Sequence, residues 1–270
     1  MSAGKENNLE YLKTEYQDST NLISRISLHD RFSTNPYGWA RWVFDQLRLQ
    51  PDREILELGC GTGGLWKGNL ERIPKGSRIL LTDFSDGMLK DTKKNLSGKR
   101  TFSFKVLDAN EKPLPFENAS FDTVIANHML YYVTDRQELF SEINRILKPG
   151  GHFYASTIGK QHLVEITNLL NTFDPALASF WESTSGIFTL ENGKVQLFPW
   201  FNNISLRVYE DSLKVTEIEP LVDYIRSGLI GRFPEDRLDE LKALIKRVMD
   251  FHHGAINITK SSGIFEAVRK

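Results

Sequence analysis

The run of residues 55–64, ILELGCGTGG, constrains the fold more than any other part of the sequence. A short apolar segment, typical of a buried strand, leads directly into a loop that contains Gly59, Gly61 and Gly63. Glycine has no Cβ, so this loop lets the backbone approach a ligand closely, and a helix that followed it would present unpaired N–H groups. Such glycine strings also occur in simple tight turns, so the surrounding sequence must decide between a turn and a ligand loop.

Apolar or β-branched runs alternate with helical patterns from residue 54 to residue 157. Ser85 is placed to cap one of the intervening helices and Asp135 to open the next. This alternation predicts an α/β fold with a doubly wound, mostly parallel sheet. With two further candidates near the C-terminus, seven strands are expected, at 54–58, 78–82, 103–107, 123–126, 152–157, 204–208 and 263–269.

The remaining segments of the 270-residue chain are expected to flank or interrupt this core. Residues 1–52 form a helical leader, in which apolar spacing predicts a helix over 37–49. The cofactor-binding core covers 53–157, an inserted cap covers 158–203, and 204–270 completes the sheet around a helical insertion that begins near Pro234. No linker is long enough to separate two independent domains, so one sheet-based core is expected.

Aromatic side chains are concentrated in the expected cap, between Phe173 and Phe201. They could wall an apolar substrate pocket, or they could be the ordinary core of the cap. The second interpretation is favoured, because large aromatic residues are usually buried for packing.

The charge balance excludes several kinds of partner. The sequence has 34 Lys+Arg against 35 Asp+Glu, for a formal net charge of −1 and a pI near 6.6. It therefore lacks the basic surplus of a nucleic-acid or anionic-membrane binder, and a small-molecule partner is expected. The sequence gives no indication of oligomeric state.

Cysteine and histidine usage points to the cytoplasm and away from metal chemistry. The single cysteine, Cys60, excludes an intramolecular disulfide, and the polar N-terminus lacks the apolar segment of a secretory signal. The adjacent His252 and His253 point in different directions on any regular element and have no third ligand nearby, so no metal site is expected.

Polar residues end two of the expected strands. Asp83 ends the second, about 20 residues beyond the glycine loop, and Asp108 with Asn110 ends the third. An acidic side chain at the spacing of Asp83 can accept both hydroxyls of a ribose. Because parallel strands end at the same edge of a sheet, these groups should meet there.

Several motifs in order give the chain a more specific resemblance. The runs ILELGCGTG, LDA at 107–109, LPFENASFDTVIANHMLYYV and ILKPGGHFYAST, together with Asp83, resemble a class I S-adenosylmethionine-dependent methyltransferase. The branch it most resembles contains the small-molecule enzymes similar to the ubiquinone and menaquinone methyltransferases. The resemblance implies a Rossmann-like fold, S-adenosylmethionine as cofactor, and a last strand that inserts antiparallel between its neighbours.

The same resemblance implies roles for individual residues. Gly59 and Gly61 would approach the methionine part of the cofactor, and Glu57 would orient its amino group. Asp83 would hold the ribose. The remaining implied cofactor contacts are Phe84 or Met88 beside the adenine, Asp108 with Ala109 at the adenine edge, and Asn127 facing the sulfonium.

The substrate side is expected to involve Tyr37, His128 and Tyr131, under a lid made by the leader and the cap. His128 is the one catalytic candidate, as a general base. Methyl transfer to an atom that is already nucleophilic needs no base, so His128 could equally be a positioning or packing residue.

Three cofactor-side residues have simpler interpretations. Asp83 could be no more than a residue at the start of a helix, and Asp108 could stabilise a turn. Cys60 has no base in its sequence context and is expected to be a small packing residue rather than a nucleophile.

Two other functions share the glycine loop. A nicotinamide-dependent oxidoreductase would also use the loop and Asp83, although it explains neither Asp108 and Ala109 nor His128. A non-catalytic protein that only binds S-adenosylmethionine would keep the whole cofactor site. The sequence has no GxSxG, GxxxxGK[ST] or HExxH motif, so esterase, P-loop and zinc-protease functions have no support.

Overall fold

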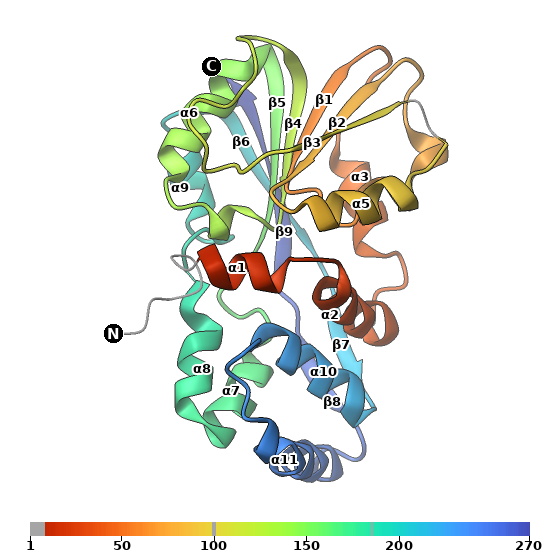
Figure 1. Ribbon diagram of the computed structural model, residues 1–270, viewed down its shortest axis with the longest axis vertical. Coiled ribbons are helices and arrows are strands. Elements are labelled where there is room, and N and C mark those ends of the chain that lie inside the picture. Colours follow the sequence, from red (N-terminus) through yellow and green to blue (C-terminus); the bar gives the residue numbers. More distant parts are fainter. Residues whose placement is uncertain (1–8, 99–100, 185) are drawn as a thin grey trace.

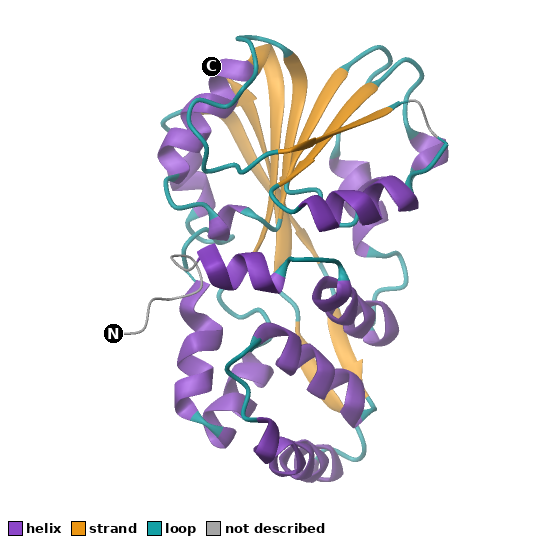
Figure 2. Ribbon diagram, viewed as in Figure 1, coloured by secondary structure: helices purple, strands orange, loops and turns teal. Residues whose placement is uncertain are grey.

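The computed structural model describes residues 9–98, 101–184 and 186–270. The first eight residues of the expected leader therefore lie outside the described residues. Seven strands form one sheet in the order β3-β2-β1-β4-β5-β9-β6 (Figures 1 and 2). Their bounds are β1 Glu54–Leu58, β2 Arg78–Asp83, β3 Phe102–Val106, β4 Phe121–Asn127, β5 Leu147–Ile158, β6 Phe201–Tyr209 and β9 Ser262–Arg269.

The first five strands of this sheet run parallel, and β9 inserts between β5 and β6, antiparallel to both. The predicted doubly wound sheet with an antiparallel last strand is thus confirmed. The central strands β1 and β4 are buried along almost their whole length. Continuous apolar runs such as VIA at 124–126 of β4 are what a parallel strand covered by helices on both faces requires.

Helices cover the two faces of the sheet with separate apolar clusters. On one face, α6 (Arg136–Ile146) and α9 (Gly193–Leu197) pack over residues such as Leu56, Val124 and Phe153. On the other face, α3 (Trp39–Gln46), α4 (Gly64–Lys67) and α5 (Asp86–Asn95) pack over Ile55, Ile79 and Ile125. Side chains alternate between the two faces along each strand, as the pleat dictates.

Two predicted helix starts are confirmed by their caps. The Ser85 Oγ accepts from the Met88 N–H at 3.1 Å, and the Asp135 carboxylate accepts from the Glu138 N–H at 3.0 Å. The helix expected over 37–49 is shorter than predicted. It begins after Gly38, whose φ of 86° is not helical, and ends before the extended Leu47. Its apolar residues Val43 and Phe44 pack on the sheet as expected.

A helical lobe with its own apolar core stands beyond the carboxyl edge of the sheet (Figure 1). Its helices are α7 Val164–Phe173, α8 Pro175–Trp181, α10 Ile218–Gly228 and α11 Leu238–Phe251. A two-stranded antiparallel sheet, β7 Ser212–Val215 with β8 Ile256–Thr259, packs with them. Neither of these four-residue strands was predicted from the sequence.

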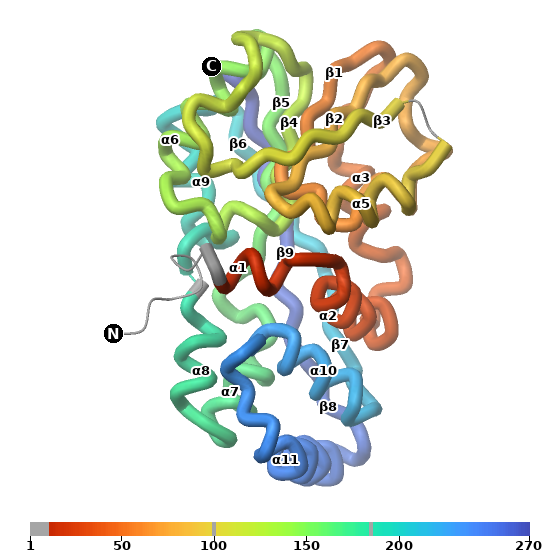
Figure 3. The backbone as a smooth tube through the Cα atoms, viewed as in Figure 1, coloured from red at the N-terminus to blue at the C-terminus, as the bar shows by residue number. Residues whose placement is uncertain are grey.

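The start of the described chain lies between the sheet and this lobe. Helices α1 (Leu9–Glu15) and α2 (Thr20–Phe32) run across the molecule at the level where the parallel strands end (Figure 3). Leu28 and Phe32 of α2 belong to the core of the lobe. An isolated bridge between Ser33 and Leu213 joins the end of α2 to β7. This arrangement leaves a space enclosed by sheet, leader and lobe.

None of the described helices combines the length and apolar character needed to cross a membrane.

Candidate active site

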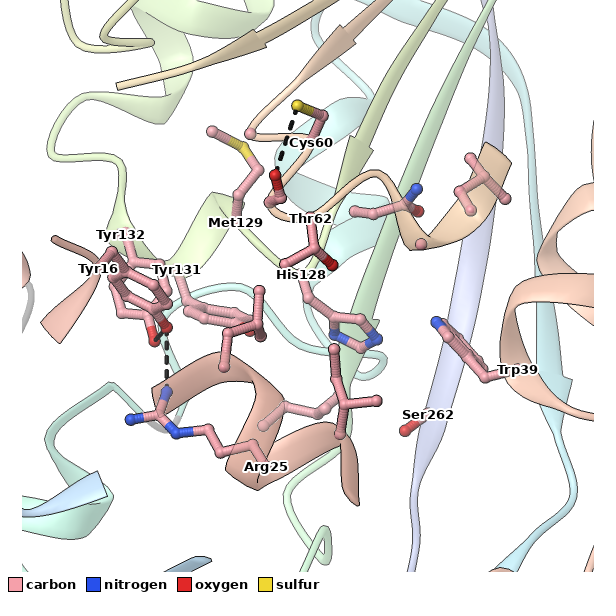
Figure 4. Close-up of a pocket in the computed structure, with 18 of the residues that line it drawn as sticks. Tyr16, Arg25, Trp39, Cys60, Thr62, His128, Met129, Tyr131, Tyr132 and Ser262 are labelled. Atoms are coloured by element: carbon pink, nitrogen blue, oxygen red, sulfur yellow. Dashed lines mark hydrogen bonds between the residues drawn. The ribbon is translucent and has the colours of Figure 1, made fainter. Parts of the chain in front are cut away.

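A cavity of about 1310 Å³ occupies the space between the carboxyl edge of the sheet and the helical lobe. Its walls come from the ends of β1, β2 and β4, from α1 and α2, and from the turns that join the sheet to the lobe. Figure 4 shows part of this wall, with His128, Tyr131 and Trp39 facing the same space. We call the part beside the glycine loop the cofactor end, and the part beside α2, the lobe and the β8–β9 turn the acceptor end.

The glycine loop forms one wall of the cofactor end. Gly59, Gly61 and Gly63 have φ values of 66°, 54° and 73°, a region that side chains disfavour. A Cβ on Gly59 would lie 3.1 Å from the Cβ of Met129, and one on Gly63 would lie 2.8 Å from the Thr92 Cγ2. The loop therefore needs glycine both for its conformation and for its close packing.

The helix after this loop is much shorter than the sequence suggested. The predicted ligand-binding helix end is only the four-residue α4, so the loop backbone and not a helix terminus must form this wall. Cys60 is buried, and burial raises the pKa of its thiol well above the usual value. A protonated, buried thiol fits the expected packing role and not that of a nucleophile.

Glu57 joins the first strand to the fourth beneath the loop. Its side chain is 2% exposed, and it accepts hydrogen bonds from the Trp66 Nε1 at 2.6 Å and the Asn127 Nδ2 at 3.0 Å. Burial raises the pKa of Glu57 to about 7. The Oδ1 of Asn127 is buried and has no hydrogen-bond partner among the described residues. This unused acceptor, beside a carboxyl group, suits a bound amino group.

Asp83 lies at the end of β2 and is 6% exposed. Its carboxylate accepts from the backbone N–H groups of Gly61 and Ser85, each at 3.0 Å. Burial nevertheless raises its pKa to about 6. Because the cap of α5 is Ser85, Asp83 is not needed for that purpose. Two carboxylate oxygens hold about four lone pairs, so Asp83 can still accept two bonds from the cavity.

The other residues expected at the cofactor also line the cavity: Phe84, Met88, Asp108 and Ala109. Phe84 is 37% exposed and meets the ring of Tyr16 edge-on at 6.3 Å. Asp108 accepts from the Asn110 backbone N–H at 2.8 Å, which is the turn-stabilising role that the sequence left open. It performs this role while facing the cavity, so the two interpretations are compatible.

His128 lies just beyond β4 at the boundary between the two ends. Its φ of 49° is left-handed, and its N–H is held by the carbonyl and the hydroxyl of Ser156. The imidazole is tilted against Trp39, with ring centroids 5.1 Å apart. Burial, with a smaller effect of Lys260, lowers the pKa of His128 to about 4.

Of the two tyrosines expected on the substrate side, the structure brings only one to the cavity. Tyr131 lines it and packs edge-on against Tyr132 at 4.6 Å. Tyr37 is 43% exposed, donates its hydroxyl to Asp45, and is not among the residues that line the cavity. The ring of Tyr37 packs against Arg41 and its hydroxyl reaches Asp45, so the following α3 contributes Trp39 to the wall instead.

Of the aromatic residues between Phe173 and Phe201, some form core and at least one lines the cavity. Phe188 and Phe201 are buried in the core beside the sheet, whereas Trp181 lines the cavity.

Several cavity residues were not anticipated from the sequence: Tyr16, Arg25, His29, Tyr132, His162 and Lys260. They come from four parts of the chain that are far apart, residues 16–29, 132, 162 and 260, so no sequence spacing links them. The lobe and the leader bring them together only when the chain folds.

A polar latch connects the leader to the sheet and the lobe. The hydroxyls of Tyr16 and Tyr132 are 2.8 Å apart, and Arg25 donates to the Tyr16 hydroxyl at 3.1 Å (Figure 4). Arg25 also pairs with Glu15 and donates to the Ser227 carbonyl at 2.5 Å. Gly87 contributes by having no side chain, since a Cβ there would lie 2.0 Å from the Gln17 carbonyl oxygen. The leader is thus held closed over the cavity.

Residues 56–155 match the protein family described as "Methyltransferase domain". Among curated proteins, the chain is 33% identical over 140 residues to malonyl-[acyl-carrier protein] O-methyltransferase 2 of Ilyobacter polytropus, covering 52% of this chain and 51% of that protein. It is 38% identical over 135 residues to the demethylmenaquinone methyltransferase of Lactococcus lactis, covering 50% of each. The chain thus spans about half the length of these curated relatives.

Solved structures show the same fold over most of the chain. The phosphoethanolamine N-methyltransferase 2 of Haemonchus contortus, in complex with phosphomonomethylethanolamine and S-adenosylhomocysteine, superposes with a TM-score of 0.60 at 19% identity. The match covers 96% of this chain and 60% of that one. A methyltransferase of Thermotoga maritima, described as a possible histamine N-methyltransferase, gives a TM-score of 0.56 at 15% identity, covering 96% of this chain and all of the other.

Proposed function

We propose that this chain, whose residues 56–155 match a methyltransferase domain, is a class I methyltransferase that binds S-adenosylmethionine and transfers its methyl group to a small or medium-sized molecule. The observation that carries the proposal is the cofactor end of the cavity. A glycine loop, a buried Glu57–Asn127 pair and Asp83 converge there on one space. The sequence relatives named above are methyltransferases that share the domain.

The described residues fit this cofactor. The unused Oδ1 of Asn127 and the carboxyl of Glu57 would hold the amino group of its methionine part. Asp83 would accept the ribose hydroxyls, and Phe84, Met88 and Asp108 would surround the adenine. A nearby ammonium would lower the raised pKa of Glu57, because it favours the carboxylate. When bound, S-adenosylmethionine supplies a methyl group already activated by a positively charged sulfur.

Holding the acceptor in line with that methyl group is the main task left to the protein. Orienting two reacting groups can lower the activation barrier by roughly 7–11 kcal/mol in favourable cases, and this needs no catalytic triad. His128, Tyr131 and Trp39 lie where the two ends of the cavity meet, and we assign them to the acceptor. The leader, held closed by the latch of Tyr16, Tyr132 and Arg25, would exclude water.

His128 would act on the acceptor in one of two ways. With a pKa of about 4 it is uncharged at neutral pH, so its imidazole is free to accept a proton or a hydrogen bond from the acceptor. As a general base it would remove the proton of a hydroxyl or amine as the methyl bond forms. As a positioning group it would only orient that atom.

The most direct test of the activity uses a metabolite extract and S-adenosylmethionine that carries a deuterated methyl group. The proposal predicts a species whose mass rises by one labelled methyl in the presence of the protein. It also predicts that the Asp83→Ala variant loses this signal at limiting cofactor concentration. A protein that binds S-adenosylhomocysteine but labels no extract component would be a non-catalytic binder, and the activity proposal would fail.

A further inference from the structure

Three histidines from separate segments face the acceptor end of the cavity. His29 lies on α2, His128 follows β4, and His162 lies in the turn between β5 and α7. Lys260, in the turn between β8 and β9, lines the same wall. We call these four residues the histidine pocket. The proposed methyl transfer requires at most one of the imidazoles, so the other two need an explanation.

Two of the three imidazoles are stacked on each other, and one of their nitrogens lacks a hydrogen bond. The rings of His29 and His162 are stacked with centroids 6.3 Å apart, and His128 leans on Trp39. The Ser261 N–H donates to the His162 Nδ1 at 3.1 Å, so the neutral ring carries its hydrogen on Nε2. The Nδ1 of His29 is buried and has no hydrogen-bond partner in the described part of the chain. An unsatisfied, buried polar atom in a cavity wall is a mark of a ligand site.

Lys260 is the charged group of this wall. It pairs with Asp211, and the two side chains are 7% and 1% exposed. The Asp211 carboxylate is already occupied by the Ser33 hydroxyl and the Asn35 N–H in addition to Lys260. It therefore has little capacity left for a ligand. Other titratable side chains that line the cavity near the lobe are Asp30, Tyr131, Lys160, Glu182 and Tyr224.

The electrostatics of the pocket are set by burial and by positive charge. Burial first, and then Lys260 and His128, lower the pKa of His29 to about 3, while burial and then Lys260 lower that of His128 to about 4. The pKa of His162 is also lowered well below its usual value, by burial and then by His29 and His128. Asp211 opposes this effect only weakly, and only at His29. An anion placed among these rings would stabilise their charged forms and reverse the shifts.

We propose that the histidine pocket binds an anionic group of the methyl acceptor, a carboxylate or a phosphate, and that the imidazoles take up protons from solvent as it binds. This inference rests on the proposed function, because it names the class of acceptor. An imidazole nitrogen without a partner among the described residues, that of His29, and a nearby ammonium, that of Lys260, suit an anionic oxygen group. The alternative of a metal centre has no support, since no three His, Cys, Asp or Glu side chains among the described residues are placed to hold an ion.

The proposal can be tested with simple aromatic probes on protein saturated with S-adenosylhomocysteine. Benzoate, phenyl phosphate and the uncharged benzamide have similar rings and differ in the polar group. Titration of the histidine side chains by NMR should show that an anionic probe raises the pKa of at least one pocket histidine by about one unit, a tenfold change in proton affinity. Benzamide should leave these pKa values unchanged.

The two anions distinguish the possible sources of the charge. A larger response to benzoate would assign the pocket to a carboxylate, and a larger response to phenyl phosphate would assign it to a phosphate. If neither anion moved the pocket histidines further than benzamide does, up to the solubility limit of the probes, the proposal would be wrong.

Substitutions test which histidines bind the anionic probe. His29→Gln and His162→Gln should each weaken binding of the effective anion about tenfold, since each removes an imidazole that lines the pocket. The matched control is His252→Gln, because His252 is exposed at the end of α11 and does not line the cavity. An equal loss in the control would overturn the assignment.

Failure of this inference can be told apart from failure of the proposed function. Binding of S-adenosylhomocysteine is measured separately, by calorimetry, and it also shows that each variant is folded. Cofactor binding and methyl transfer without any anion response would leave the function intact and remove only the histidine pocket. If the anions shifted the histidine pKa values but the protein did not bind S-adenosylhomocysteine, the proposed function would fail and the pocket would remain only an anion site.

Discussion

The two ends of the cavity are built from different kinds of chain segment. The cofactor end consists of residues at or just after the ends of parallel strands, such as Glu57, Asp83 and Asn127. The acceptor end takes His29 from a leader helix, His162 from a turn, and Lys260 from a second turn close to the C-terminus. The first end follows from the geometry of a parallel sheet, whereas the second exists only because the lobe packs against the leader.

Burial acts on both ends and shifts their titrations in opposite directions. At the cofactor end it raises the pKa of Glu57 to about 7 and that of Asp83 to about 6. At the acceptor end it lowers the pKa of His29 to about 3. Removal from water always disfavours the charged form, which is the deprotonated acid in one case and the protonated base in the other. Each end therefore holds groups whose charged form burial disfavours and a ligand of opposite charge would stabilise.

The largest expected effect concerns the pH dependence of stability. Glu57 titrates near 4.5 when unfolded and near 7 when folded, so the folded state binds the extra proton between these values. Its contribution to stability is fully present below pH 4.5 and is lost as pH rises through 7, by about 3 kcal/mol. Glu57→Gln should remove this loss from the free energy of unfolding, measured with denaturant between pH 4.5 and 8.

His29 should change the pH dependence of stability in the opposite direction, so it is the comparison for Glu57. It titrates at 6.5 when unfolded and near 3 when folded, so its contribution is present above pH 6.5 and is lost as pH falls toward 3. His29→Gln should reduce the loss on acidification and leave the alkaline side unchanged. If Glu57→Gln and His29→Gln altered the same side of the stability profile, the electrostatic contrast between the two ends would be wrong.

The second effect is on cofactor affinity. Asp83→Ala removes a buried acceptor of two backbone N–H groups and the expected partner of the ribose. We expect a loss of about 1.5–3 kcal/mol, or roughly one to two orders of magnitude in affinity for S-adenosylmethionine, by calorimetry. Asp86→Ala, at the exposed start of α5, is the control and should bind normally. Undiminished binding by Asp83→Ala would remove the assigned role.

The third effect concerns His128, at the junction of the two ends, and should appear in turnover but not in cofactor affinity. His128→Asn should lower turnover about tenfold while cofactor affinity stays the same, because His128 is assigned to the acceptor. If His128 is the general base, turnover of the unmodified protein should fall only below pH 4 or so, following its lowered pKa. A variant with unchanged rate and pH profile would exclude His128 as a base.

The smallest effect concerns the latch. Tyr16→Phe removes the hydroxyl that meets Tyr132 and Arg25, and a single such bond contributes about 1 kcal/mol. We expect dissociation of S-adenosylhomocysteine to accelerate by a factor of about five or less, measured by stopped-flow competition. Tyr37→Phe loses a hydroxyl outside the cavity and should not change this rate. Equal acceleration in both variants would mean that the latch does not hold the cavity closed.

Most of the sheet and the cofactor end could be predicted because their signals are local. An apolar run, a glycine loop and strand-end residues such as Asp83 and Asn127 lie within short stretches whose geometry is fixed by parallel pairing. The expected cofactor-side residues all line the cavity. Even here the short length of α4 was missed, although Gly68 at its C-terminus is a common helix-ending residue.

The acceptor end and the lobe could not be predicted, for physical reasons. The strands β7 and β8 have four residues each and owe their pairing to the lobe core, so their own sequences carry little signal. Tyr37 was expected at the cavity because it lies in the leader, but its ring packs against Arg41 and its hydroxyl reaches Asp45. The histidine pocket is formed by residues that lie up to 231 positions apart, from His29 to Lys260, and only tertiary packing brings them together.

The account depends most on the identity of the molecule at the cofactor end. Calorimetric titration of the protein with S-adenosylhomocysteine and, in parallel, with NADH tests this directly, since both contain an adenosine and differ in what the Glu57–Asn127 pair would contact. We predict one saturable site for S-adenosylhomocysteine and no measurable heat with NADH. Tight binding of NADH, or absence of binding by S-adenosylhomocysteine, would contradict the assignment of the cavity to methyl transfer.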